Sequence, residues 1–212
     1  MMSLHPTLAE PTRVSELRRQ WDECRSIRIA PFLDDDNARE LLTYLRGEPY
    51  ELRATEPSRF NYQYWELDGT PHEHECDHPL CATGRWLWDD GATWLSRLTG
   101  MGLGPPPDRK LVSTLYSKGC FLDAHSDCDG DRQLAFVLGL TEASPSGAGG
   151  QLEFLGFDDS RSWVDEVRAP GWNSLDIFDV TSHRFVHQVA LIDEAYERRA
   201  VSGWFWAADA DS

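Results

Sequence analysis

Two histidines and one aspartate are spaced so that they could bind one metal ion together. His125 and Asp127 are two residues apart in the stretch 121–127, and side chains at i and i+2 of an extended strand point to the same side. His187 lies much further along the chain, in a second strand-like stretch at 184–189. Two imidazoles and one carboxylate on one face of a metal leave the opposite positions open, which is the ligand set of non-haem Fe(II) oxygenases.

An arginine downstream of these residues could complete a site for an acidic co-substrate. Arg198 and Arg199 begin another strand-like stretch, and a guanidinium group binds a carboxylate through two parallel hydrogen bonds. A lone His-x-Asp occurs by chance in many proteins, and a single histidine is usually an ordinary core residue. The ordered set of His-x-Asp, a distant histidine and then arginine, each in a strand-like stretch, favours a metal site that also holds a dicarboxylate.

The composition predicts a single globular domain with an acidic surface. The chain has 212 residues, 41% of them hydrophobic, and nine tryptophans, so it can form a sizeable core. Its 20 basic and 36 acidic residues give a net charge of −16. This charge argues against nucleic acid as a direct ligand, because phosphates are bound by Lys and Arg. It is compatible with a basic protein or peptide partner, although a solvated acidic surface is the commoner reason for such a charge.

The cysteines and the N-terminus predict a cytoplasmic protein. The five cysteines have no disulfide-rich spacing, and the N-terminus has no basic region followed by an apolar segment, so no signal peptide is expected. No apolar run is long enough to span a bilayer. We therefore expect a soluble protein with reduced thiols and no membrane contact; the sequence leaves its oligomeric state open.

Residues 1–109 are expected to form a helical or mixed support for the site. Val14, Leu17 and Trp21 recur at helical spacing, and the acidic run 34–36 suits a helix N-terminus. The expected elements are helices at 11–27, from 34–36 to Gly47 and at 86–99, with extended stretches at 27–32 and 60–65.

Residues 110–207 change character and predict a β-rich core. Strand-like runs follow one another with turn-rich pieces between them: 111–116, 120–124, 133–140, 151–157, 174–180, 185–191 and 198–207. Many short strands without intervening helices favour an antiparallel sandwich or barrel. The predicted fold is mainly β with N-terminal helices, around a double-stranded β-helix (jelly-roll or cupin-like) core that carries the site at its mouth.

The segment His72–Cys81 has two interpretations. It contains three histidines and two cysteines, and nitrogen and sulfur ligands suit Zn²⁺. The spacing is tighter than in usual zinc fingers, and acidic residues lie between the candidate ligands. The other interpretation is an acidic loop near the mouth of the site.

Residues 116–127 resemble the signature Y-x-x-G-x-F/Y-x-x-x-H-x-D of prolyl 4-hydroxylase-type 2-oxoglutarate oxygenases. The segments 170–180, 187–189 and 198–205 are similar to the ribosomal prolyl hydroxylases, specifically their single-domain, prokaryotic-like group. Those enzymes modify a proline of a small-subunit protein near the decoding centre. The resemblance covers most of residues 28–207 and implies the double-stranded β-helix fold.

The resemblance also implies roles for individual residues. The iron ligands would be His125, Asp127 and His187, and 2-oxoglutarate would be anchored by Arg198, with Arg199 as the competing candidate. Strand parity favours Arg198, because it shares one face with Ser202 and Trp204, which would help to line the pocket. Tyr116 matches a family tyrosine that reaches the co-substrate; a buried core tyrosine is the alternative interpretation.

Two positions depart from the family pattern. Relatives often place a tyrosine on the strand 133–140 that helps the arginine hold the far carboxylate, and Gly139 stands there in this chain. Either Tyr116 or another group substitutes, or 2-oxoglutarate binds more weakly, or the pocket is reshaped. His183 lies four residues before His187 and could be mistaken for the ligand, but Gln-Val follows His187 as it does in the family.

The activity implied by the resemblance is hydroxylation of a prolyl residue in a basic, ribosomal or translation-related protein. It would use Fe(II), 2-oxoglutarate and O₂, with ascorbate as an optional addition. One alternative is the same chemistry on a free amino acid or a small biosynthetic molecule. A second alternative, from another class, is a non-catalytic metal-binding jelly-roll module.

Overall fold

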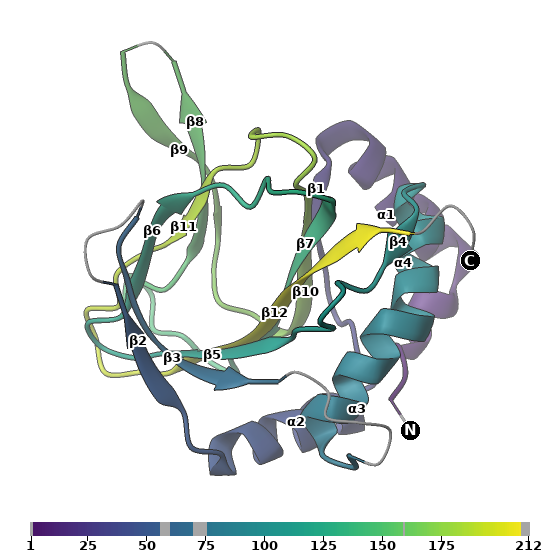
Figure 1. The fold of residues 1–212 in the computed structure, drawn as a ribbon, viewed down its shortest axis with the longest axis horizontal. Helices are drawn as coiled ribbons and strands as arrows, with labels where there is room; N and C mark the ends of the chain where they lie inside the picture. The colour runs from purple at the N-terminus through teal and green to yellow at the C-terminus, as the bar shows by residue number, and fades with distance from the viewer. Residues whose placement is uncertain (1, 56–59, 70–75, 159, 209–212) are drawn as a thin grey trace.

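In the computed structural model, which describes residues 2–55, 60–69, 76–158 and 160–208, a curled antiparallel sheet carries helices on one side (Figure 1). The helices are η1 (Pro6–Ala9), α1 (Pro11–Cys24), α2 (Asp35–Gly47), α3 (Pro79–Trp86), η2 (Leu87–Gly91) and α4 (Ala92–Thr99). The strands are β1 (Ser26–Ile29), β2 (Glu51–Ala54), β3 (Tyr62–Asp68), β4 (Leu103–Gly104), β5 (Val112–Tyr116), β6 (Phe121–His125), β7 (Arg132–Leu140), β8 (Leu152–Phe157), β9 (Ser162–Arg168), β10 (Trp172–Asp179), β11 (His187–Val189) and β12 (Arg198–Ala207).

The first two α-helices form where the sequence predicts them. Proline occupies the first turn of α1, where its missing N–H costs nothing. The Asp34 side chain accepts a hydrogen bond from the Asp36 amide and so caps α2. Each helix buries one apolar stripe, which includes Leu17 and Trp21 in α1 and Leu41 in α2.

The third predicted helix begins earlier than expected. The sequence predicts a helix at 86–99, whereas α3, η2 and α4 together run from Pro79 to Thr99. Pro79 lies in the first turn, and Gly100 ends α4 in a left-handed conformation with φ of 74°. Gly91, which weakens a regular helix, belongs to the π-helical turn η2.

The strands pair in the order β1-β10-β7-β12-β5-β3-β6-β11-β8-β9, while β2 pairs with β3 and β4 with β12. All of these pairings are antiparallel, and the sheet curls around an interior (Figure 1). The predicted jelly-roll-like core is confirmed. Strands β2, β4 and β9 were not predicted, and the strand expected at 185–191 is reduced to β11.

Alternation along the strands separates two hydrophobic layers. On β12, Val201 and Phe205 belong to the cluster that the helices share, together with Trp21 and Leu41. The opposite face of β12 turns toward the interior, where Trp204 packs with a second cluster: Ala135, Leu152, Phe154, Phe178, Val180 and Phe185. The helices therefore stiffen the outer face of the sheet and leave the interior for a site.

Two of the five cysteines are not free thiols. Cys76 and Cys81 form a disulfide, so the expectation of reduced thiols is wrong for this pair, and their sulfurs are not available as thiolate ligands of zinc. His72 and His74 lie outside the described residues. The ring of His78 packs against Tyr44 at 5.4 Å between centroids.

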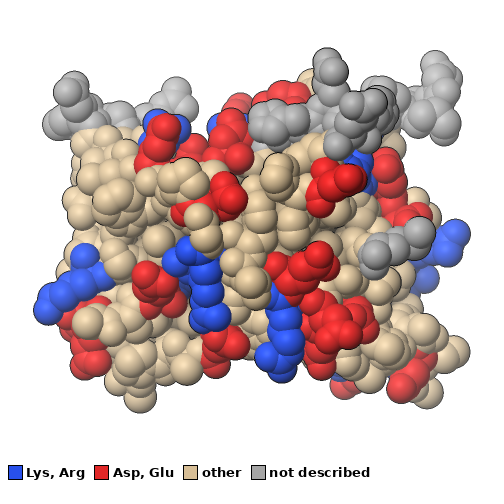
Figure 2. Space-filling model, turned by 90° about the horizontal axis from the view of Figure 1, so that it is seen from below, with Lys and Arg blue, Asp and Glu red and all other residues tan. Residues whose placement is uncertain are grey.

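The acidic excess does not form one uniform patch on the face seen from below. Figure 2 shows acidic and basic side chains interspersed there, with uncharged surface between them. No helix in the described part of the chain is both long and apolar enough to cross a membrane.

Candidate metal centre

The pairing of β6 with β11 brings the three predicted metal ligands together. His125, the last residue of β6, lies directly opposite His187, the first residue of β11. Their ligand atoms and those of Asp127 all lie within 4.8 Å of one another. Asp127 Oδ1 is 3.7 Å from His125 Nε2, and Asp127 Oδ2 is 3.6 Å from His187 Nε2. The two Nε2 atoms and the carboxylate thus converge on one point, as a metal ion requires.

Both imidazoles are held in the tautomer that a metal needs. His125 Nδ1–H donates to the Asp123 carbonyl at 3.0 Å, and His187 Nδ1–H donates to the Phe185 carbonyl at 3.1 Å. A carbonyl oxygen can only accept, so the proton must lie on Nδ1. The Nε2 lone pairs are then free to face Asp127, which is the usual outer-shell arrangement around metal-binding histidines.

Burial keeps the second histidine neutral. His187 is 5% exposed, and its burial, together with the nearby His125, lowers its pKa to about 4, although the Asp127 carboxylate acts in the opposite direction. At neutral pH His187 therefore offers an unprotonated nitrogen. An imidazole in this form is a metal ligand, whereas an imidazolium is not.

Aromatic rings flank the two histidines. Phe60 stacks on His125 with ring centroids 4.9 Å apart. Phe178 meets His187 edge to face at 4.8 Å, and Phe154 lies 6.0 Å from the same imidazole. Such a shell limits the access of water and strengthens electrostatic interactions at the centre.

A buried arginine without an anionic partner lies further along the interior. Arg198 is 6% exposed, and its guanidinium lies 4.9 Å from the ring centroid of Tyr116, the residue paired with it on β5. Burial lowers its pKa. Within the described residues it makes no hydrogen bond and no ion pair. A buried cation is costly unless it is paired, so this group suits an anion that enters from outside.

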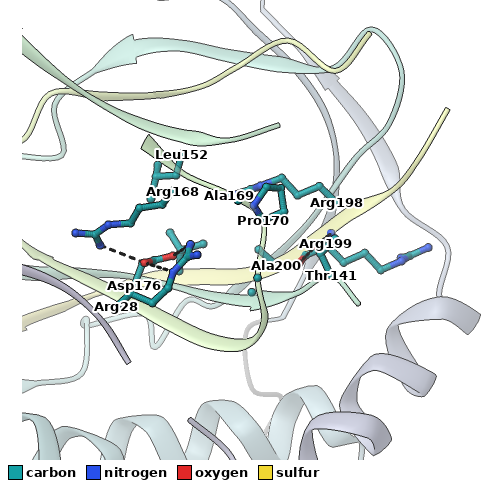
Figure 3. A pocket seen from close by; sticks show the side chains of 13 residues that line it. Arg28, Thr141, Leu152, Arg168, Ala169, Pro170, Asp176, Arg198, Arg199 and Ala200 are labelled. Atoms are coloured by element: carbon teal, nitrogen blue, oxygen red, sulfur yellow. Dashed lines mark hydrogen bonds and ion pairs between the residues drawn. The ribbon is translucent and has the colours of Figure 1, made fainter. Parts of the chain in front are cut away.

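The neighbouring arginine points the other way. Figure 3 shows Arg198 and Arg199 on opposite sides of β12. Arg199 donates to Glu197 at 2.9 Å and to the Leu45 carbonyl at 3.2 Å, and it lies over the Tyr50 ring. Its partners lie on the helix side, which agrees with the strand parity predicted from the sequence.

The pocket beside Arg198 contains a network of buried and partly buried charges that was not predicted from the sequence. Arg28 binds both oxygens of Asp176, at 2.9 and 2.8 Å, and Arg168 binds one of them at 3.1 Å (Figure 3). Arg168 also donates to Ser26 at 2.8 Å. One carboxylate is thus balanced by two guanidinium groups, and Arg198 adds a third positive charge to the lining. The sequence does contain a sign of this network, because Asp176 is a charged residue between Leu175 and Ile177 in an apolar strand.

Gly139 lines the same pocket, and its place is closed to a side chain. A Cβ built there would lie 2.7 Å from the Gly171 carbonyl oxygen and 2.9 Å from Ser174 Oγ. The backbone between β9 and β10 therefore leaves no room for a side chain at position 139. The polar lining of the pocket comes from the Arg28, Arg168 and Asp176 network.

The remaining predicted residues lie near the site without lining this pocket. Tyr116 is buried under Arg198, and its burial raises the pKa of its hydroxyl. Trp204 packs in the interior cluster with its indole N–H buried and without a hydrogen-bond partner among the described residues. Ser202 shares the face of Arg198 and Trp204. His183 is hydrogen-bonded to Ser126 at 3.0 Å and is not part of the metal-ligand group.

The donor set and the buried cation fit two specific groups. Two neutral imidazoles and a carboxylate on one side suit Fe(II) and leave positions for a chelating acid, and Arg198 suits the far end of a dicarboxylate. A curled jelly-roll-like sheet with this pair of candidate subsites is typical of the 2-oxoglutarate-dependent Fe(II) oxygenases.

A sequence model of the 2OG-Fe(II) oxygenase superfamily matches residues 111–206. This range contains His125, Asp127, His187 and Arg198. The matched range covers a little under half of the chain and is similar to enzymes that use Fe(II) and 2-oxoglutarate. The chain is 29% identical over 180 residues to the Xenopus laevis protein named prolyl 3-hydroxylase OGFOD1. The match covers 84% of this chain and 34% of that protein, so the chain spans about a third of the relative's length.

Solved structures show the same fold. A Pseudomonas putida prolyl-4-hydroxylase has a TM-score of 0.67 and 21% identity, with coverage of 92% of this chain and 99% of that chain. A Trichoplax adhaerens prolyl hydroxylase, solved with a peptide fragment of the hypoxia inducible factor oxygen degradation domain, has a TM-score of 0.67 and 16% identity, with 93% of both chains covered. At these identities the likeness concerns the fold.

Proposed function

We propose that this chain is an Fe(II)- and 2-oxoglutarate-dependent hydroxylase that acts on a prolyl residue of a protein substrate. The observation that carries the proposal is Arg198, a buried guanidinium without an anionic partner in the described structure, on the same interior as the His125, Asp127 and His187 group. A metal-binding module without catalysis has no need for such a cation. The names of the relatives support the choice of proline.

In this proposal each residue has one task. His125, Asp127 and His187 would hold the iron through two nitrogens and a carboxylate. Arg198 would bind the far carboxylate of 2-oxoglutarate, while the Tyr116 ring fixes its guanidinium. When bound, Fe(II) supplies the oxidising chemistry, in which 2-oxoglutarate and O₂ give succinate and CO₂ and one oxygen atom is inserted into a substrate C–H bond.

The protein's own contribution is orientation and exclusion of water. The Nδ1 hydrogen bonds of both histidines hold their rings in place, and Phe60, Phe154 and Phe178 surround them. Arg28 and Arg168 neutralise Asp176. Without them that carboxylate would repel a dicarboxylate from the same pocket.

The finer parts of the proposal concern substrate and location. A basic ribosomal or translation-related protein agrees with the net charge of −16 and with the family resemblance. We further propose that residues 1–212 form one domain, with 1–109 supporting the jelly-roll core at 110–207. A cytoplasmic location remains a prediction, and the Cys76–Cys81 disulfide weighs against it because cytosolic thiols are kept reduced.

An anaerobic titration with Fe(II) and then 2-oxoglutarate tests the site. The chelate should give a weak visible charge-transfer band in the wild type and none in His125→Ala. His183→Ala is the matched control, because His183 lies close to the site but outside the ligand group, and it should keep the band. A band that survives in His125→Ala would show that the site is assigned wrongly.

The substrate is tested separately. Small ribosomal subunits from cells lacking the enzyme, incubated with the loaded protein in air, should gain one oxygen atom on a prolyl residue of one protein. Succinate formation without any oxidised ribosomal protein would leave the oxygenase in place and remove the ribosome as its substrate.

A further inference from the structure

The β8–β9 hairpin stands out from the rim of the curled sheet, beside the metal centre (Figure 1). The register places four residues in one row across four strands: His125 opposite His187, His187 opposite Phe154, and Phe154 opposite Glu166. Strands in a sheet are about 4.8 Å apart. The outer strand β9 therefore runs about 10 Å from β11 and continues past the level of the metal ligands.

One edge of β9 has no strand beside it. β9 ends the strand order and pairs with β8 alone among the strands described here. Residues 162–167 of β9 are all exposed. An edge of this kind presents backbone N–H and C=O groups that an extended peptide can pair with.

Trp163 gives this edge an aromatic surface on the side of the active site. Leu152 and Phe154 face the interior, so two-residue alternation puts Gly156 on the same face. Trp163 lies opposite Gly156, and a Cβ added to that glycine would overlap the indole. The indole therefore lies over the backbone of β8 at Gly156. It is 41% exposed, a large value for a tryptophan in the interior-facing row.

The charge of the hairpin favours a basic partner. Residues 151–168 contain five acidic and two basic residues, and Arg168 is buried against Asp176 and Glu166. Asp165, the extra residue at the irregularity between β8 and β9, is exposed. A second copy of this acidic chain would be repelled at this edge, because like charges across an interface are unfavourable.

We propose that the edge of β9 binds an extended, basic, proline-containing segment of the protein substrate, and that Trp163 packs against a residue of that segment near the target proline. This inference rests on the proposed function. Trp163 lies two strands away from His187 across the sheet and two residues further along β8, which corresponds to a distance of about 12 Å from the metal ligands. An extended chain spans this distance in about three to four residues. Trp163 is thus a specificity residue that touches the flanking sequence and not the reacting atoms.

The test measures binding without turnover. The probe is a synthetic peptide with a central proline and alternating lysine and threonine on both sides, labelled with a fluorophore, and its acidic counterpart has glutamate for lysine. Anaerobic protein loaded with Fe(II) and 2-oxoglutarate is titrated, and anisotropy gives Kd. Trp163→Ala should weaken binding of the lysine peptide about tenfold, since exposed aromatic anchors dominate such interfaces.

Two further variants separate this role from general damage. Gly156→Ala keeps the indole but displaces it, so it should weaken binding to a similar extent. Trp65→Ala removes a tryptophan of comparable exposure from β3, outside the hairpin, and should leave Kd unchanged. The Fe(II)–2-oxoglutarate band should persist in Trp163→Ala, Gly156→Ala and Trp65→Ala. Absence of this band in the wild type would refute the proposed function and not the peptide binding at the edge of β9.

Hydrogen exchange locates the peptide. The lysine peptide should slow exchange of amides in Ser162–Arg168. The inference is overturned if the wild type does not bind the lysine peptide, if it binds the glutamate peptide equally well, if Trp163→Ala binds as tightly as the wild type, or if protection appears at β1, the other end of the sheet.

Discussion

Replacing Arg198 and Arg199 separately by Met should change stability in opposite directions. Arg198 is buried and has neither a hydrogen bond nor an ion pair within the described residues, and its guanidinium lies against the Tyr116 ring. The desolvation of a buried ion amounts to several kcal/mol, and a cation–π contact returns about 1–2 kcal/mol. The protein without co-substrate should therefore become more stable by about 1–3 kcal/mol in Arg198→Met.

Arg199 is equally buried but paired. Its replacement removes the hydrogen bond to the Leu45 carbonyl and the ion pair with Glu197. Glu197 is largely exposed, so the ion pair is screened and contributes little. Loss of a charge-assisted bond to a buried carbonyl costs about 1.5–3 kcal/mol, and Arg199→Met should lose about that much stability.

Urea unfolding at neutral pH, with and without 2-oxoglutarate, measures both effects. Loss of about two charge-assisted hydrogen bonds should weaken 2-oxoglutarate binding about 100-fold in Arg198→Met. A co-substrate concentration that is 100 times the wild-type Kd should stabilise the wild type by about 2.7 kcal/mol and this variant far less. Lower stability of Arg198→Met in the absence of co-substrate would refute the reasoning, because it would mean that the guanidinium already has a stabilising partner.

Three other substitutions or conditions test the site. Asp176→Asn should lower the free energy of unfolding by about 1.5–3 kcal/mol, because Arg28 and Arg168 lose charge-assisted hydrogen bonds, although Arg168 keeps its ion pair with Glu166; a change below about 0.5 kcal/mol in urea unfolding would show that the network is not structural. Gly139→Ala should cost about 1–3 kcal/mol by overpacking against the Gly171 carbonyl, and should weaken 2-oxoglutarate binding in calorimetry; wild-type values of both would argue against a closed pocket wall. The pKa of His187 is about 4 when folded and about 6.5 when unfolded, so the unfolded chain binds more protons between these values. The metal-free protein should therefore lose up to about 3 kcal/mol as pH falls from about 6.5 to about 4, and a pH-independent unfolding midpoint over that window would contradict the burial of a neutral imidazole.

Local pattern was enough to pair His125 with Asp127 as candidate metal ligands. His125 and Asp127 are neighbours in the chain, and alternation alone separates Arg198 from Arg199. Most of the strands, though not β2, β4 or β9, were predictable for the same reason, since two-residue periodicity is a local property. Resemblance to a family added the roles of these residues, which the pattern by itself does not give.

The parts that were missed depend on distant contacts. Arg28 and Asp176 are 148 positions apart, and each is unremarkable by itself. β9 is a strand with an exposed side chain at nearly every position, so it has no apolar alternation to reveal it. The Cys76–Cys81 disulfide depends on loop geometry, and the closed wall at Gly139 depends on how the backbone returns from β9 to β10.

A metal ion bound at the short strand β11 would stabilise the fold as well as support catalysis. Strand β11 has three residues, its register against β6 is irregular between His187 and Val189, and it supplies one of the three ligands. An ion bound by β6, β11 and Asp127 would act as a cross-link across this short ladder of the curled sheet, because binding free energy at such a site is also folding free energy. Iron loss would then loosen β11 first. The abundance of the folded enzyme in a cell, and not only its turnover, would follow the iron supply.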